Sequence, residues 1–492
     1  MEIAEEKSAA VKEDKKARRI RYAKQFLIVV TASLANIPSG MIQLWPNVLA
    51  SHIVRDNSTI FGSEIQFEPW QMDLVVSVTQ IGSLVGFLSA GFFLSLVGRK
   101  WSLIITAIPG IFGSALITLS FNTYMVIAGR FLDGMTVGMA NVAVFVYASE
   151  VSDVRVRGTL GMASHLLVQI GGITNISLGI LLNWYYMSLI CACFLLAHCL
   201  TVFTLHESPS FLAVKGHDEG ALKVLRKLRG SHVDVHEELT YLQQQNQATD
   251  DTQGGRGLLQ KQHLQKIGLM SGILFIHNFC GTQVLRMNAT RQLQELGLPM
   301  DEKFTTILVI VVLFFGNFFM TLILDSFGRR RCIITSLMVV AASYISLGTF
   351  IYLQDTNPSL TDPRKDELLK FAYSVENATL TDVVAEGSAI MSISDWLPLV
   401  FLMFAAFGHS TGIGPLVWLL PPEMFPTNLR SQGTSVCMVI GSLQMFTILQ
   451  LFSLMQDTLT QAGMYWLFAG VAVAGIFFIY FLLKETGGTR VG

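Results

Sequence analysis

The recurrence of apolar runs long enough to cross a membrane constrains this chain more than any other feature. Twelve such runs lie close to the ranges 26–49, 72–94, 102–121, 124–149, 161–183, 185–205, 267–287, 304–324, 332–352, 396–420, 432–455 and 463–483. A run of about 20 apolar residues is typical of a transmembrane helix. Backbone groups in lipid must be satisfied internally, and no alternating strand pattern competes with helix here. The sequence therefore predicts an all-α membrane protein with twelve transmembrane helices.

The composition argues against the main soluble classes. Hydrophobic residues make up 51% of the chain and charged residues only 14%, against about 25% charged residues in a typical soluble protein. The net charge of −1 provides no basic field for nucleic acid. The six cysteines lie in or beside apolar runs without zinc-site spacing, and there is no phosphate loop or nucleophile–base motif. We therefore expect no enzyme activity, no metal and no cofactor.

Positive charge predicts the orientation of the helices. Basic residues cluster before the first run and after the second, fourth and eighth runs, which marks that side as cytoplasmic and places both termini there. The segment 353–395, with eight acidic and three basic residues, falls outside. The sequons at Asn57 and Asn377 also fall in outside loops, so both are candidate glycosylation sites. We expect a multi-pass protein of the plasma membrane whose partners are membrane lipid and a small solute.

Five segments are expected along the chain. They are a basic cytoplasmic tail at 1–25, a six-helix bundle at 26–205, a cytoplasmic linker at 206–265, a second six-helix bundle at 266–483 and a cytoplasmic tail at 484–492. Within the linker, apolar residues recur at helical spacing with charges between them. That pattern predicts short amphipathic helices at the inner face of the bundle.

Two pairs of motifs indicate that the bundles repeat each other. "VGRK" follows the second run and "FGRRR" follows the eighth, 230 residues later. A glutamate and an arginine seven residues apart follow the fourth run and again the tenth run, 273 residues later. The 43-residue segment 353–395 accounts for the difference between the two offsets. Two parallel six-helix pseudo-repeats are typical of some secondary transporters.

Five strings, in this order and at these helix ends, point to a family. They are GRFLDG (129–134), YASEVSDVRVRGTLG (147–161), ESPSFLAVKG (207–216), GIGPLVWLLPPEMFP (412–426) and KETGG (484–488). Through them the chain resembles the sugar porters of the major facilitator superfamily over nearly its full length. The strings RGTLG and DVHEEL look most like the arthropod facilitated trehalose and glucose transporters. The resemblance implies a solute site at the membrane midplane and alternating access by rocking of the two halves.

The resemblance also implies a role for charged residues near the inner helix ends. The candidates for a salt-bridged cytoplasmic gate are Arg99, Arg130, Glu150, Arg157, Glu207, Asp325, Arg329, Glu423 and Arg430. Pairing between the halves would hold the cytoplasmic side shut, whereas the alternative is that these charges only fix topology. Ser95 and Leu96 replace the Asp-Arg of the family's inner loop motif, and Ser326 replaces the corresponding arginine in the second half. These departures predict a weaker or asymmetric lock.

Sugars are bound by amides, hydroxyls and a stacking aromatic ring, because they offer hydroxyl groups and apolar faces. The candidate ligands, most of them placed by alignment with the family pattern, are His165, Gln169, His277, Asn278, Gln283, His409 and Trp418. His165 and Gln169 are four residues apart and therefore share one helix face. Each candidate has the alternative role of a packing residue.

Arg286 closes the seventh run, which is expected to break near Gly281. Its long side chain can snorkel to the outer interface or join an outer-gate pair, or it can bind solute, which would favour an anionic substrate. The first run contains no carboxylate, where proton-coupled relatives usually carry one, and this favours facilitated diffusion. His165 or His277 could still titrate near neutral pH.

Taken together, these features predict a monomeric facilitative transporter of a hexose or disaccharide. Two alternatives remain open from the sequence. One is a transporter of another polar or anionic solute, and the other is a solute sensor on the same fold that does not transport.

Overall fold

The computed structural model describes residues 21–53, 58–62, 64–153, 157–229, 235–236, 238–240, 260–296, 302–356, 396–425 and 429–483. These residues are almost entirely helical, and in place of a sheet the described part has one isolated bridge, between Ser58 and Glu64. The expected all-α class is confirmed. Several predicted features lie outside the described residues: both glycosylation candidates Asn57 and Asn377, most of the loop 353–395, most of the N-terminal tail, the tail 484–492 and much of the linker 206–265.

The helices group into two compact units, each described here by itself. The first unit comprises Met1–Phe275, Pro415–Gln450 and Thr486–Gly492, and the second comprises Ile276–Gly414 and Leu451–Glu485. These units do not coincide with the expected bundles 26–205 and 266–483. The reason is that α21 packs against α3 and is therefore counted with the first unit.

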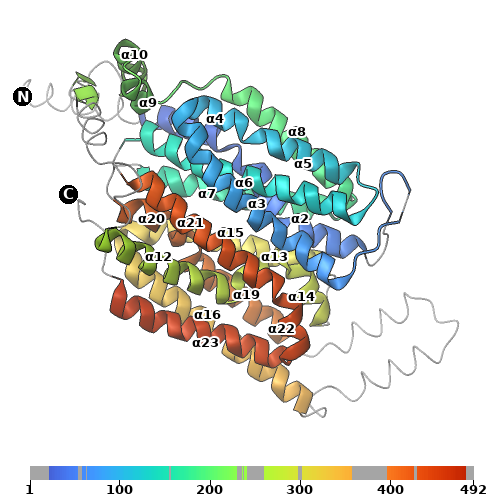
Figure 1. Ribbon diagram of the computed structural model, residues 1–492. Helices are drawn as coiled ribbons and strands as arrows, with labels where there is room; N and C mark the ends of the chain where they lie inside the picture. Colours follow the sequence, from blue (N-terminus) through green and yellow to red (C-terminus); the bar gives the residue numbers. More distant parts are fainter. Residues whose placement is uncertain are drawn as a thin grey trace, which may run out of the picture. The chain divides into compact units, whose positions relative to one another are not determined.

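The first unit contains the helix Arg21–Ser33 and most of the helices from the N-terminal half (Figure 1). Its elements are α2 (Asn36–Ile53), α3 (Pro69–Leu96), α4 (Arg99–Ile105), α5 (Ala107–Thr118), α6 (Thr123–Val151), α7 (Arg157–Leu178), α8 (Trp184–Val202), α9 (Pro209–Val214), α10 (Asp218–Arg229), most of α12 (Lys261–Phe279), most of α20 (Ile413–Met424) and α21 (Arg430–Gln450).

Glycines allow the longest helices of this unit to approach closely. α3 packs against α6, where a Cβ on Gly82 or Gly86 would meet backbone oxygens of α6, and one on Gly134 or Gly138 would meet backbone oxygens of α3. In lipid the hydrophobic effect does not drive helices together, so close van der Waals packing at small residues supplies much of the attraction. The glycines of "GRFLDGMTVG" therefore have a packing role that their apolar context alone does not reveal.

The second unit holds the remaining helices. They are the last turn of α12, α13 (Thr282–Met287), α14 (Ala289–Glu295), α15 (Glu302–Phe327), α16 (Arg329–Thr356), α19 (Leu397–Ser410), α22 (Phe452–Thr458) and α23 (Gln461–Leu482). α16 packs against both α19 and α23, and α15 packs against α19. Between α16 and α23, Tyr344 stacks on Tyr465 with ring centroids 5.8 Å apart.

Ten of the twelve expected spans are long and apolar enough to cross a membrane as helices of the described structure, and two fall short. Within the described residues, nine helices are long and apolar enough to cross a membrane, and the pair Arg21–Ser33 and Asn36–Ile53, bent by 41°, makes a tenth. The two expected spans that fall short contain α7 and α12. Both carry polar residues proposed as solute ligands, including Gln169 and His277, and these residues lower the mean hydropathy. α12 also begins with the polar run Lys261–Lys266 and ends at Phe279, so its apolar stretch is short.

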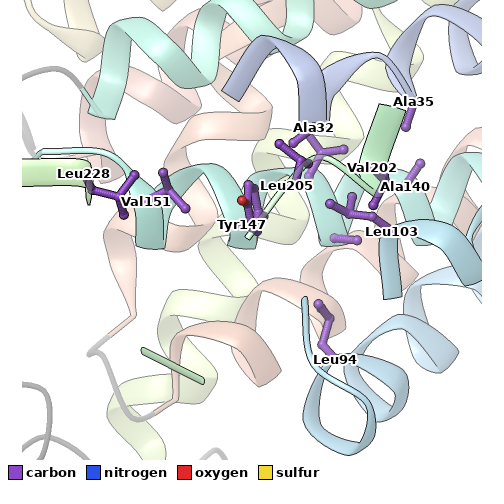
Figure 2. Packing of buried hydrophobic residues seen from close by; sticks show 12 residues of the cluster. Ala32, Ala35, Leu94, Leu103, Ala140, Tyr147, Val151, Val202, Leu205 and Leu228 are labelled. Atoms are coloured by element: carbon purple, nitrogen blue, oxygen red, sulfur yellow. The ribbon is translucent and has the colours of Figure 1, made fainter. Parts of the chain in front are cut away.

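The linker helix α10 is amphipathic, as predicted. Its buried residues Ala221 and Leu225 pack with α9 and with Val235. Leu228 reaches an apolar cluster at one end of the bundle that includes Tyr147 and other residues of α6 (Figure 2). The opposite face of α10 is charged and exposed.

Candidate functional site

The seventh span is broken where the sequence predicted a break. α12 ends at Phe279, α13 begins at Thr282, and Gly281 between them has φ 87°. An added Cβ at Gly281 would also lie against the ring of Phe468 on α23. Both constraints favour glycine, because a side chain is strained at positive φ. A break inside a membrane helix interrupts its internal hydrogen bonding, and transporters commonly place solute groups at such points.

Three candidate ligands meet at this break. The Nε2 of Gln283 lies 2.8 Å from the Nε2 of His277. The His277 ring packs on the His409 ring with centroids 5.0 Å apart and an interplanar angle of 32°. All three side chains are buried. Each histidine lies in the last turn before a helix break, since α19 ends at Ser410 and α20 begins at Ile413. The second unit thus brings together three of the residues chosen from sequence.

Arg286 lies on α13, three residues beyond Gln283. Its side chain is buried, at 8% exposure. Burial argues against snorkelling to the interface, because a snorkelling guanidinium would be exposed at the helix end; the outer-gate pair and the solute-binding role stay predictions. Arg286 is buried because the break at Gly281 turns α13 into a separate short helix whose six residues are all buried. Asn278 is buried as well.

Two polar residues of the second unit, one of them at the break, were missed from the sequence. The Tyr344 hydroxyl of α16 lies 3.5 Å from Thr282 Oγ1, to which it donates a long hydrogen bond. Asn317 of α15 is buried, and its Oδ1 accepts no hydrogen bond from the described residues. Asn317 was detectable as the one amide within the apolar run 304–324. Tyr344 carried no such signal, because tyrosines are common in apolar runs.

The other candidate ligands lie in the first unit. His165 and Gln169 are on α7 with the expected four-residue spacing, and His165 is half-buried while Gln169 is buried. The Oε1 of Gln169 accepts no hydrogen bond from the described part of the chain. A buried acceptor of this kind is a candidate for a water or solute hydroxyl. Trp418 is half-buried on α20.

The charged residues Arg99, Glu150 and Glu207 form one cluster at the ends of α4, α6 and α8. Arg99 binds Glu150 with two guanidinium nitrogens, Nη2 to Oε1 at 2.7 Å and Nε to Oε2 at 3.0 Å. Glu207 Oε1 accepts from the backbone N–H groups of Arg99 at 2.8 Å and Lys100 at 3.2 Å. Ser208 Oγ donates to Glu150. These contacts all lie within the first unit.

The loop glycine of "VGRK" is required by this cluster. Gly98 has φ 93°, and a Cβ there would come within 2.5 Å of Glu207 Oε2. No contact with this cluster is described for the other predicted gate residues. Arg329 is half-buried at the start of α16, and the side chains of Arg157, Asp325, Glu423 and Arg430 lie outside the described residues.

Arg130 does not belong with the inner cluster, which corrects the expectation from sequence. It lies near the start of α6, whereas Glu150 lies at its end. Twenty residues of continuous helix separate the two by about 30 Å. The structure instead surrounds Arg130 with backbone carbonyls of α2 and α3: Nη1 donates to Ile42 at 2.7 Å and Nε to Val75 at 3.3 Å.

The counter-charge of Arg130 is Asp133, one helical turn along α6. The carboxylate lies 3.8 Å from Arg130 Nη1, and the two side chains are only 4% and 1% exposed. Ser114 Oγ donates a long hydrogen bond of 3.4 Å to Asp133 Oδ1, and the guanidinium lies over the Trp45 ring at 5.2 Å. Asp133 was overlooked in the sequence, although an acid three residues after a basic residue in an apolar run was a sufficient signal.

A double-mutant cycle is expected to separate the inner cluster from ordinary surface pairs. Arg99→Ala and Glu150→Ala are expected to show a coupling of about 1–2 kcal/mol, because the pair is bidentate and mostly buried. The matched control is Arg21 with Asp153, which is about as buried but is joined by a longer contact of 3.5 Å; because its geometry is poorer, we expect less than about 1 kcal/mol. Thermal unfolding of the purified protein measures both cycles. Equal couplings would contradict a special role for the Arg99 cluster.

The sequence model of the Sugar (and other) transporter family matches residues 40–491. The chain is 27% identical over 468 residues to the facilitated trehalose transporter Tret1 of Drosophila pseudoobscura pseudoobscura, which covers 94% of this chain and 50% of that protein. It is equally similar to the Tret1-2 homolog of Drosophila simulans, with 27% identity over 468 residues, 94% of this chain and 88% of the relative. The chain therefore spans about half the length of several curated relatives that it matches.

Solved structures establish the fold. The proton:xylose symporter XylE bound to 6-bromo-6-deoxy-D-glucose matches with a TM-score of 0.72 and 20% identity, over 94% of this chain and 97% of that chain. A partially occluded inward open conformation of XylE from E. coli matches with a TM-score of 0.69 and 19% identity, over 94% and 100% of the two chains. The fold is thus the major facilitator fold with its two pseudo-repeats. Since the family model spans most of the sequence, the chain belongs to the Sugar (and other) transporter family, a family of multi-pass membrane transporters and not of enzymes.

Proposed function

We propose that this protein moves a hexose or disaccharide across the membrane by facilitated diffusion with alternating access. The observation that carries the proposal is the break at Gly281, where the side chains of His277, Gln283 and His409 lie together and are buried. Family membership supports a solute-transport role for this group. Relatives named as facilitated trehalose transporters support a sugar as the solute.

The chemistry of the group suits a neutral polyol. Imidazole and amide groups can each donate and accept hydrogen bonds, and a sugar hydroxyl requires both. The contact between Gln283 and His277 orients the amide and one imidazole relative to each other, so less side-chain freedom is lost when solute binds. Within the first unit, the further candidate ligands His165, Gln169 and Trp418 offer an imidazole, an amide and an apolar ring face.

The lack of an acidic residue in the described first span favours facilitated diffusion over proton coupling. The helices Arg21–Ser33 and α2 contain no acidic residue, so the position used by many proton-coupled relatives has no group to carry the proton. Two acids are buried within the described spanning helices: Asp133 on α6 has Arg130 beside it, and Asp73 lies on α3, outside the first span. We therefore propose that uptake needs no accompanying proton.

A second candidate function is transport of an anionic solute. It is favoured by one observation, the burial of Arg286 one turn after Gln283. A buried guanidinium would bind a carboxylate or phosphate in two-pronged geometry. The two candidates differ in their response to Arg286→Gln, which should abolish transport of an anion and leave a neutral sugar able to bind.

Uptake of radiolabelled glucose and trehalose by expressing oocytes tests the proposal. We expect saturable uptake that is similar at acidic and neutral pH. His277→Ala and Gln283→Ala should each raise the half-saturating concentration by roughly three- to tenfold, the loss of about one hydrogen bond. The control is His198→Ala, a buried histidine of α8 that should alter only the amount of folded carrier. Absence of uptake of either sugar despite surface expression would overturn the sugar proposal and favour an anion screen.

We further propose a monomer in the plasma membrane with both termini in the cytoplasm and glycans at Asn57 and Asn377. The positive charges after the second, fourth and eighth spans support the orientation,. Treatment of cell-surface protein with a glycosidase is expected to shift its mobility, and Asn57→Gln with Asn377→Gln should remove that shift.

A further inference from the structure

The exposed face of α10 forms a basic hollow. It is lined by Lys223, Arg226 and Lys227 together with Glu219 and Leu222, and has a volume of about 520 Å³. The three cations are at helical spacings of three and four residues, so they share one face of the helix. A single acid, Glu219, opposes them among the lining residues.

The orientation of α10 on its unit is fixed by contacts on the other side of the helix. Ala221, Leu225 and Leu228 are buried against neighbouring helices. At the end of α10, Arg229 binds Glu238 at 2.8 Å and donates to the backbone carbonyl of Val151 at 3.1 Å. The apolar face of α10 is therefore used for packing, and the cations of the hollow are held outward.

The hollow lies close to the level of a membrane interface. Lys227 Nζ lies 2.8 Å from Nε2 of His206, which follows α8 by four residues. Nearby, Lys100 Nζ donates to the Phe203 carbonyl at 2.9 Å. At the same end of the bundle, Trp101 and Phe203 are 51% and 55% exposed and pack edge to face at 6.3 Å. Exposed tryptophan beside lysine is typical of the headgroup region.

The cations near His206 influence its pKa. Burial lowers the pKa of His206, and the neighbouring charges of Lys227, Lys100 and Lys223 lower it further. A neutral imidazole can accept the hydrogen bond from Lys227, which explains the close contact. His206 thus lies within the electrostatic influence of Lys227, Lys100 and Lys223.

We propose that the basic hollow binds the headgroup phosphate of an anionic phospholipid in the adjacent leaflet. Clustered cations on an amphipathic helix beside a membrane span attract anionic lipid, and Arg226 can hold two phosphate oxygens at once. The orientation predicted from positive charge makes this the cytoplasmic leaflet, which carries anionic lipid. The lipid would hold α9 and α10 at the membrane surface. This site is independent of the transported solute.

Lipid retention by the full-length protein tests this site. The purified chain is incubated with mixed micelles containing labelled phosphatidylserine, and bound lipid is measured after washing. The triple variant Lys223→Gln, Arg226→Gln, Lys227→Gln is expected to bind phosphatidylserine up to roughly a hundredfold more weakly, given about a fivefold contribution from each cation near the surface. Raised salt should weaken wild-type binding in the same direction.

Two single variants sharpen the test. Glu219→Gln removes the acid found among the described lining residues of the hollow and should strengthen binding several-fold. Lys215→Gln removes an exposed cation of the same segment that does not line the hollow, and should change binding little. If the triple variant retains phosphatidylserine as wild type does, or if Lys215→Gln is equally damaging, the site is not the hollow. Binding of inorganic phosphate as tight as that of the lipid would also overturn the proposal, in favour of a soluble anion.

Discussion

Arg130→Leu is expected to destabilise the protein by about 3–5 kcal/mol. The substitution leaves the Asp133 carboxylate buried beside an apolar group, since the two side chains are 3.8 Å apart and almost wholly enclosed. It also removes the guanidinium hydrogen bonds to the Ile42 and Val75 carbonyls and the contact with Trp45. Thermal unfolding of purified protein, followed by loss of the monodisperse species, measures the effect.

The double variant Arg130→Leu, Asp133→Leu identifies the cause. If the uncompensated carboxylate is responsible, removing it should recover a large part of the lost stability, because an apolar pair often replaces a buried ion pair at little cost. The control Lys215→Leu removes an exposed cation and should change stability by less than about 0.5 kcal/mol. A double variant that is less stable than Arg130→Leu alone would show that Asp133 is not held by Arg130.

The second large effect is expected from Gly281→Ala. The residue would have to keep a positive φ, which costs an L-amino acid about 1–2 kcal/mol, and its Cβ would press on the Phe468 ring. Overpacking of this kind adds about 1–3 kcal/mol. We therefore expect a loss of stability of several kcal/mol, together with loss of transport, because the break that positions Gln283 would shift.

A glycine on the same helix provides the matched control. Gly268 lies within α12, and a Cβ added there meets no atom within 4 Å. Gly268→Ala is therefore expected to be neutral or to stabilise the helix by up to about 1 kcal/mol. Adding Phe468→Ala to Gly281→Ala should relieve the steric part of the loss and leave the part due to backbone strain. If Gly281→Ala unfolds at the wild-type temperature, the break does not depend on glycine.

The fold class followed from the sequence because membrane helices are encoded locally. Each span must be apolar over about 20 residues, and that requirement is visible without knowing any neighbour. The break at Gly281 was equally local in origin, since a glycine with polar residues on both sides interrupts an apolar run. The amphipathic character of α10 was visible in the spacing of Ala221, Leu225 and Leu228.

The identities of partners were not encoded in this way. Glu150 was a candidate for pairing across the two halves, and the partner that the structure shows for it is Arg99, another candidate, within the first unit. Arg130 was grouped with the inner charges, yet its counter-charge is Asp133, a residue in its own helix. Charge spacing shows which residues need a partner, but the partner is chosen by which helices pack together. The burial of Arg286 was not predictable for the same reason, because it depends on which helices surround α13.

By itself, the sequence determined that this chain is a bundle of membrane helices, where most helices lie, which residues resemble a sugar porter and where the seventh span breaks. Only the tertiary structure decided that His277, Gln283 and His409 meet at that break, that Arg286 is buried, and that Glu207 and Phe468 require glycine at positions 98 and 281. The physical reason is the distance along the sequence over which each kind of interaction acts. Lipid solvation and helix propensity act on consecutive residues, whereas hydrogen bonds, ion pairs and steric contacts join residues that only packing brings within a few ångströms.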